Sequence, residues 1–207
     1  MQEVILTMAV QRSQGWMDAC AKLVDGVEFK TTLRARVAVA LHHLCIEHHL
    51  AGHVLVHSGV RGSAFALYRP QFEAYVRANW YFDCASDEEL EKFVRGGEPP
   101  KMHQLTADLA GTLGQVGEII RSVKDQAWRS MCAFTHGGAI QVKARAIKDE
   151  IRQSFTDEHA SKLIDSMATL SYLGALGIAK VADDGELAQR LYERHQEIYS
   201  VLYDAQK

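Results

Sequence analysis

Scarcity of proline is the feature that most constrains the fold of this chain. Only 3 of its 207 residues are proline, and two of these are adjacent, at Pro99 and Pro100. Ordinary usage would give about ten prolines in a chain of this length. Because proline inside a helix removes a backbone hydrogen bond and clashes with the preceding turn, its scarcity leaves long helices free to form along almost the whole chain.

Apolar residues recur at helical spacing through most of this length, and no segment alternates convincingly as a strand does. The pattern predicts an all-α fold, a bundle of roughly seven or eight helices. Residues 139–155 show no clear period and are left unassigned. The expected helices cover residues 3–24, 32–58, 63–84, a short helix after Ser86, 102–113, 115–134, 156–181, and a last helix capped by 183–186.

Pro70 is the one proline within a predicted helix. It removes one backbone hydrogen bond and disfavours helical geometry at Arg69, so we expect either a kink there or a helix that starts at Pro70. A kink would free a backbone carbonyl beside Arg69.

Composition is that of an ordinary folded protein, with 47% hydrophobic and 24% charged residues. No repeat, linker or low-complexity tract divides the chain, so we expect one domain over residues 1–207. The four cysteines lack a C-x-x-C pair, which fits reduced thiols in a cytosol. Without a basic N-terminal region or an uncharged stretch long enough to cross a bilayer, the chain is expected to be cytoplasmic and to have no contact with membranes.

Charged residues fall at core angles on two predicted helices. In residues 32–58, Arg36, His43 and Glu47 share the arc of the apolar Val39, Ile46, Leu50 and Val54. In residues 63–84, Arg69 and Glu73 share the arc of Phe65, Phe72, Val76 and Trp80, with Arg77 at its margin. Buried charges need partners because their desolvation costs several kcal/mol each, so these groups should meet one another, a ligand or water.

Two interpretations of this cluster stay open. In one, Arg36, Glu47, Arg69, Glu73 and Arg77 form a structural lattice of internal ion pairs, since Arg69 and Arg77 each lie one turn from Glu73. In the other, the excess of one positive charge leaves a guanidinium free to bind a carboxylate or phosphate, and the cluster lines a pocket for an anion.

Histidines form a second cluster. His42, His49 and His53 share another stripe of the same helix, at offsets of seven and four residues, a spacing that can chelate a metal ion. Because no carboxylate stands at ligand spacing on this stripe, we predict no metal site and place these histidines at the solvent or at an interface.

A third candidate is the run His136, Gly137 and Gly138. Consecutive glycines let backbone N–H groups turn toward an anion, and an imidazole transfers protons near neutral pH. The alternative is a plain loop in which the histidine ends a helix.

A wider pattern joins these clusters and consists of Ser63-Ala64, Ala66-Leu67, Arg69-Pro70, Phe72-Glu73, Arg77, Trp80 and Thr135-His136-Gly137-Gly138. It resembles an uncharacterised family of helical bacterial proteins, over roughly residues 36–182. More distantly, it is similar to the HEPN superfamily of nucleotide-binding and ribonuclease domains, which occur in toxin–antitoxin and phage-defence systems.

The resemblance implies a ribonuclease that needs no metal or other cofactor and whose site forms across a homodimer. Arg129 and His136 would be the catalytic pair, and RNA or a nucleotide would be the ligand, with an antitoxin or effector as a further partner. The alternative is a non-catalytic helical interaction module in which the Arg/Glu cluster is structural or binds a small anion.

Overall fold

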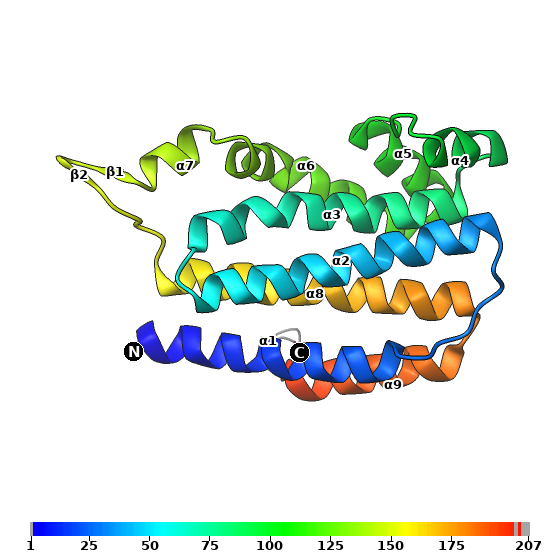
Figure 1. Cartoon of the computed structure of the whole chain (residues 1–207), viewed down its shortest axis with the longest axis horizontal. Helices are drawn as coiled ribbons and strands as arrows, with labels where there is room; N and C mark the ends of the chain where they lie inside the picture. The colour runs from blue at the N-terminus through cyan, green and yellow to red at the C-terminus, as the bar shows by residue number, and fades with distance from the viewer. Residues whose placement is uncertain (1, 201–202, 204–207) are drawn as a thin grey trace.

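The computed structural model describes residues 2–200 and residue 203 of the chain. This described part contains nine α-helices and one short antiparallel hairpin (Figure 1). In chain order the elements are α1 (Gln2–Val24), α2 (Leu33–His57), α3 (Arg61–Asp83), α4 (Asp87–Val94), α5 (Met102–Leu113), α6 (Gln115–Thr135), α7 (Ala139–Lys143), β1 (Ala146–Ile147), β2 (Glu150–Ile151), α8 (Asp157–Ala182) and α9 (Gly185–Ile198).

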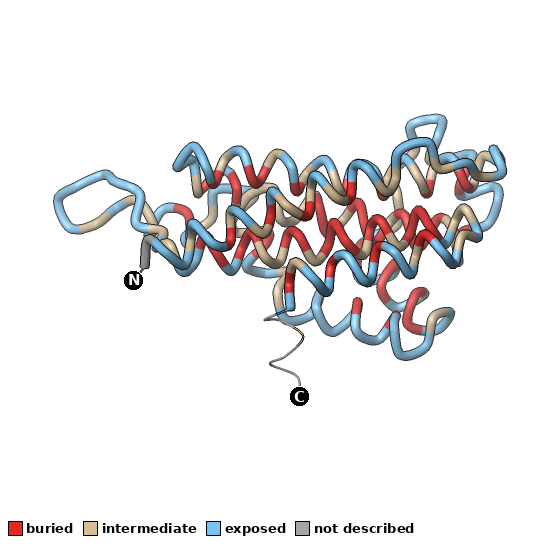
Figure 2. Tube along the Cα trace, turned by 90° about the horizontal axis from the view of Figure 1, so that it is seen from below, coloured by how far each residue is buried: buried red, intermediate tan, exposed pale blue. Residues whose placement is uncertain are grey.

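The all-α class is confirmed. The segment left unassigned, residues 139–155, holds the short helix α7 and the hairpin, which projects from the bundle and is exposed (Figures 1 and 2). The alternative that the third helix starts at Pro70 is wrong, because α3 begins nine residues earlier and continues through it. Within the described residues, no helix combines the length and the apolar character needed to cross a membrane.

Helix α8 is the centre of the bundle, since it packs against α1, α2, α3 and α9. Helices α5 and α6 pair with each other and cover the far side of α3 (Figure 1). Buried residues follow the facing sides of the helices, as Figure 2 shows. The α8 face toward α2 carries glycines: a Cβ at Gly177 would overlap the ring of His42, and one at Gly174 would lie 3.4 Å from the His42 carbonyl oxygen. Helices α2 and α8 therefore approach closely because α8 lacks side chains there.

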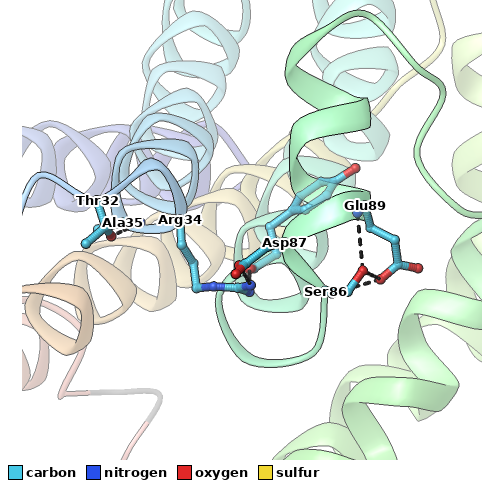
Figure 3. Close-up of polar contacts among 7 residues, drawn as sticks. Thr32, Arg34, Ala35, Ser86, Asp87 and Glu89 are labelled. Carbon is cyan, nitrogen blue, oxygen red and sulfur yellow. Dashed lines mark hydrogen bonds and ion pairs between the residues drawn. The ribbon is translucent and has the colours of Figure 1, made fainter.

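The start of α2 lies beside the start of α4, each begins with a capping side chain, and Arg34 joins them (Figure 3). The Thr32 hydroxyl caps α2 by accepting a hydrogen bond from the Ala35 N–H, at 3.1 Å. From the first turn, Arg34 donates to the Asp87 carboxylate and to the Tyr81 carbonyl oxygen, both at 2.7 Å. Ser86 and Glu89 form the capping box that begins α4, as the sequence predicts.

The predicted inner face of α2 is wrong. Arg36, His43 and Glu47 are exposed, and so are Leu50 and Val54, whose side chains were expected in the core. The true inner face packs against the glycine-bearing side of α8, so it admits mainly small residues and flat imidazoles, and one branched aliphatic side chain, Val56. It consists of Ala35, Ala38, His42, Cys45, His49, Gly52, His53 and Val56.

The prediction that the stripe of His42, His49 and His53 lies at the solvent or at an interface is also wrong, because these side chains are buried inside the chain. His42, His49 and His53 are buried, and the Ser13 hydroxyl bridges His49 Nε2 and His53 Nδ1, each at 2.9 Å. His195 is buried nearby in a stack between aromatic rings of α8 and the C-terminal region. Burial lowers the pKa of His42 and His49 to about 3 and that of His195 to about 4, so all three are neutral in the folded chain at neutral pH.

We predict that the folded state loses stability as the pH falls below about 6.5, where these histidines gain protons only in the unfolded chain. Because the folded pKa values are depressed, their contribution is complete above that pH and declines below it. Each of His42 and His49 should cost up to about 2 kcal/mol of unfolding free energy at about pH 5. Urea denaturation across this range measures the loss. His42→Gln should flatten the dependence, because glutamine gains no proton in this range, and an equally steep dependence in this variant would contradict the prediction.

Candidate functional site

A cleft of about 610 Å³ opens where α3, α5 and α6 meet. We call it the charged cleft, because most of its side chains are ionisable. Helix α3 contributes one wall, the segment that leads into α5 a second, and α6 a third. Its lining residues are Arg69, Glu73, Arg77, Glu98, Pro99, Pro100, Lys101, Met102, His103, Lys124 and Trp128.

Glu73 holds the two arginines of the α3 wall. One carboxylate oxygen accepts from Arg69 Nε at 2.7 Å and the other from Arg77 Nη2 at 2.8 Å. The i, i+4 spacing places all three on one side of the helix, as the sequence predicts. Their side chains are 20%, 15% and 31% exposed for Arg69, Glu73 and Arg77. The cluster is thus partly open to the cleft and is not a lattice sealed in the core.

Arg69 reaches two groups at the end of α6 as well. Its guanidinium carbon lies 4.7 Å from the centre of the Trp128 ring, and its Nη1 contacts His136 Nε2. Since a guanidinium group can only donate hydrogen bonds, Nε2 is the acceptor in this contact and the imidazole carries its proton on Nδ1. Arg69 thereby joins the carboxylate of Glu73 to the indole and imidazole of α6.

Pro70 explains how α6 comes to lie against this part of α3. A residue with a backbone N–H at position 70 would donate to the carbonyl of Ala66, four residues earlier, but proline has none. The hydroxyl of Thr135, the last residue of α6, lies 3.0 Å from that carbonyl and also 3.0 Å from the carbonyl of Met131. Because a carbonyl inside a helix already has the backbone N–H four residues later as its donor, the single hydroxyl proton is better used by Ala66. The freed carbonyl predicted from the sequence therefore receives the end of α6 and sets His136 beside Arg69.

The start of α5 forms the second wall. Lys101 is its N-cap residue, and no side chain caps the helix there. The first backbone N–H groups of a helix lack partners within it and carry a partial positive charge. Because Lys101, Met102 and His103 line the cleft, this uncapped end adds backbone donors to its cationic side chains.

The two glycines after His136 end α6. Gly137 adopts a φ of +66°, and the Gly138 N–H donates to the carbonyl of Ala133 at 2.7 Å, which is a Schellman cap. A Cβ at Gly138 would lie 2.9 Å from the Ala133 Cα, so this close turn requires glycine. The Gly138 N–H is thus engaged in ending the helix, as the loop interpretation of this run expects, and neither glycine lines the charged cleft.

The structure brings together only part of the predicted site. Arg69, Glu73, Arg77 and His136 meet, whereas Arg36, His43 and Glu47 lie on the exposed side of α2 and do not line the cleft. Arg129 is exposed two turns before His136 on α6, also outside the lining. Among the residues described, no group of three or more His, Cys, Asp or Glu side chains is placed to hold a metal ion.

Eight of the lining residues were absent from the predicted site, and those with a cationic or aromatic side chain are Lys101, His103, Lys124 and Trp128. Lys101 and His103 carried a weak signal, because Pro99 and Pro100 precede a helix that lacks a Ser, Thr, Asp or Asn cap. Lys124 and Trp128 share one side of α6, but nothing in their spacing says which helix they face.

Comparison with family models places this helical chain in a family of unknown function. The match covers residues 42–204, so the chain belongs to the family DUF6988. This confirms the resemblance to an uncharacterised family. No match is found among curated proteins or among solved structures.

The contact between Thr135 and Ala66 generates a double-mutant prediction. Thr135→Val should destabilise the fold by about 1 to 3 kcal/mol, because it leaves the Ala66 carbonyl without a donor. In Pro70→Ala/Thr135→Val, the new N–H at position 70 can donate to the Ala66 carbonyl, so adding Pro70→Ala should recover most of the stability that Thr135→Val loses. Urea unfolding of the wild type, both single variants and the double variant measures this coupling. If the double variant loses as much unfolding free energy as the two single variants together, Thr135 does not act through the Ala66 carbonyl.

Proposed function

We propose that this protein binds a phosphate-bearing ligand, a nucleotide or RNA, in the charged cleft. One observation carries the proposal: the uncapped N-terminus of α5 meets the arginines of α3 and the lysine of α6 around one opening. Helix N-termini and guanidinium groups both donate hydrogen bonds to phosphate oxygens.

The charge of the lining favours an anion. Four cationic side chains, Arg69, Arg77, Lys101 and Lys124, face two carboxylates, those of Glu73 and Glu98. Glu73 is already shared between both arginines. Lys124 pairs with Asp125 at 2.8 Å, which reduces but does not reverse the excess. A phosphate group would thus enter a cleft of net positive charge.

Trp128 supports a ligand that carries a base. Its indole lines the cleft beside the cationic groups, and nucleic acid bases stack on such rings with about 1 to 3 kcal/mol each. A nucleotide would engage the arginines through its phosphate and the indole through its base.

Binding of adenosine monophosphate and of a short single-stranded RNA, measured by calorimetry, tests the proposal. Arg77→Gln should weaken binding about tenfold, the loss of one charge-assisted hydrogen bond. Glu73→Gln should strengthen binding, because it releases both guanidinium groups from their carboxylate. Arg36→Gln, at an exposed arginine outside the cleft, is the matched control and should bind as the wild type does. Equal affinity in all four proteins would reject the cleft as the binding site.

The same Glu73→Gln variant separates the site from a structural lattice. Since the three side chains are partly exposed, we expect a loss of only about 1 to 2 kcal/mol of unfolding free energy. A carboxylate sealed between two arginines would cost about 3 to 5 kcal/mol. Thermal and urea unfolding distinguish the two values, and the larger loss would favour the non-catalytic structural interpretation.

RNA cleavage is a second candidate function, favoured by the position of His136. This imidazole is exposed at the end of α6 beside Arg69, and its Nδ1–H is directed away from that contact. In the chemistry implied by HEPN ribonucleases, a ribose 2′-hydroxyl loses its proton and attacks the adjacent phosphate, the bond to the 5′-oxygen of the next nucleotide breaks, and that oxygen takes up a proton. His136 would accept the first proton or donate the second, with water as the other partner, and Arg129 with Arg69 would stabilise the developing charge.

We predict that this activity, if the protein has it, persists in EDTA and disappears in His136→Ala and Arg129→Ala. Incubation of the purified proteins with labelled total RNA measures it. Because both residues are exposed, both variants should keep the unfolding transition of the wild type. Absence of cleavage by the wild type, combined with nucleotide binding in the cleft, would leave the protein as a binding module; cleavage would direct the search for partners to an antitoxin or effector.

A further inference from the structure

The outward face of α2 carries a heptad repeat. Seven of its eight exposed residues follow one another at alternating steps of four and three, the spacing of a coiled-coil seam. We call this row the α2 stripe; it consists of Arg36, Ala40, His43, Glu47, Leu50, Val54 and His57. At about 1.5 Å per residue the stripe is about 32 Å long.

No other element of the described chain covers this stripe. Helix α2 packs on α1, α3 and α8 through its remaining sides. Leu50 and Val54 are 50% and 53% exposed, and Leu44, which lies beside the stripe, is also exposed. Arg36, His43 and Glu47 form no hydrogen bond or ion pair with other described residues, although each stands on a face otherwise rich in apolar side chains.

We propose that a second copy of this chain packs on the α2 stripe, with the two α2 helices antiparallel about a twofold axis. In an antiparallel pair, residues that face each other have a constant sum of residue numbers, and a sum of 90 fits the chemistry of the stripe. Glu47 then faces His43 of the partner subunit, and Leu50 faces Ala40 of the partner subunit. The aliphatic stem of Arg36 of the partner subunit covers Val54.

Charge and size complementarity select this register over its neighbours. Because the contact is twofold symmetric, Glu47 and His43 form two equivalent imidazole-to-carboxylate hydrogen bonds across the axis. In the register with a sum of 83, Leu50 and Val54 face positions at or before the start of α2. In the register with a sum of 97, Glu47 faces Leu50 of the partner subunit. A parallel pair would oppose Glu47 to its own copy, which repels.

The oligomeric state of the full chain tests the proposal. Light scattering after gel filtration should give twice the 23.1 kDa mass of one chain. Leu50→Glu/Val54→Glu places two carboxylates in the apolar part of the seam, so it should raise the dissociation constant of the dimer at least tenfold. The matched control is Ile119→Glu, an equally exposed aliphatic residue of α6, which should leave the mass unchanged. A monomeric wild type, or a dimer lost only in the control, would overturn the proposal.

Two further variants test the register. His43→Glu/Glu47→His keeps each carboxylate opposite an imidazole only if the helices are antiparallel with the sum of 90, so it should dimerise as the wild type does, whereas His43→Glu alone should not. With mild oxidant, Ala40→Cys/Leu50→Cys should form a covalent dimer, and neither single cysteine variant should. Crosslinking of Ala40→Cys to itself would show a different register and refute this one.

Discussion

The close approach of α2 to α8 is the constraint on which the rest of the bundle depends. Gly174 and Gly177 let the two helices approach closely, so the buried face of α2 consists of alanine, cysteine, glycine and histidine, with Val56 as its one branched aliphatic residue. Neutral imidazoles contribute flat rings to this face, and the Ser13 hydroxyl of α1 forms a hydrogen bond with one ring nitrogen of His49 and one of His53. The larger aliphatic and charged residues of α2 are thereby turned outward, where they form the stripe proposed to meet a second copy.

The site depends on a second constraint, the missing N–H of Pro70. The Ala66 carbonyl accepts the hydroxyl of Thr135, and Gly137 and Gly138 end α6 at this point. Gln141 of α7 then donates to the carbonyls of Gly62 and Phe134, at 2.8 and 3.0 Å, which ties the turn back to α3 and α6. One proline therefore positions the imidazole of His136 and the indole of Trp128 beside the arginines, and it connects the local chemistry of α3 to the geometry of the cleft.

Much of the fold was predictable because its signals are local. The capping box at Ser86, the glycine turns and the scarcity of proline mark where helices start and end, and the observed bounds lie within a few residues of those expected. The Arg69, Glu73 and Arg77 cluster was predictable for the same reason, since one-turn spacing on one helix brings the groups together. The inner face of α2 was not, because Leu50 and Val54 satisfy a hydrophobic period that the glycines of α8, more than a hundred residues away, override.

By itself, the sequence determined that this chain is helical, where its helices lie, and that Pro70 frees a carbonyl beside a charged row on α3. These outcomes depend on backbone hydrogen bonding and on contacts one turn apart, which neighbouring residues specify. Only the tertiary structure decided which side of α2 is buried, which donor reaches Ala66, and that the uncapped start of α5 faces the arginines. Such pairings join segments distant in the chain, and they depend on how closely the helix axes approach and on which side chains fill the space between them.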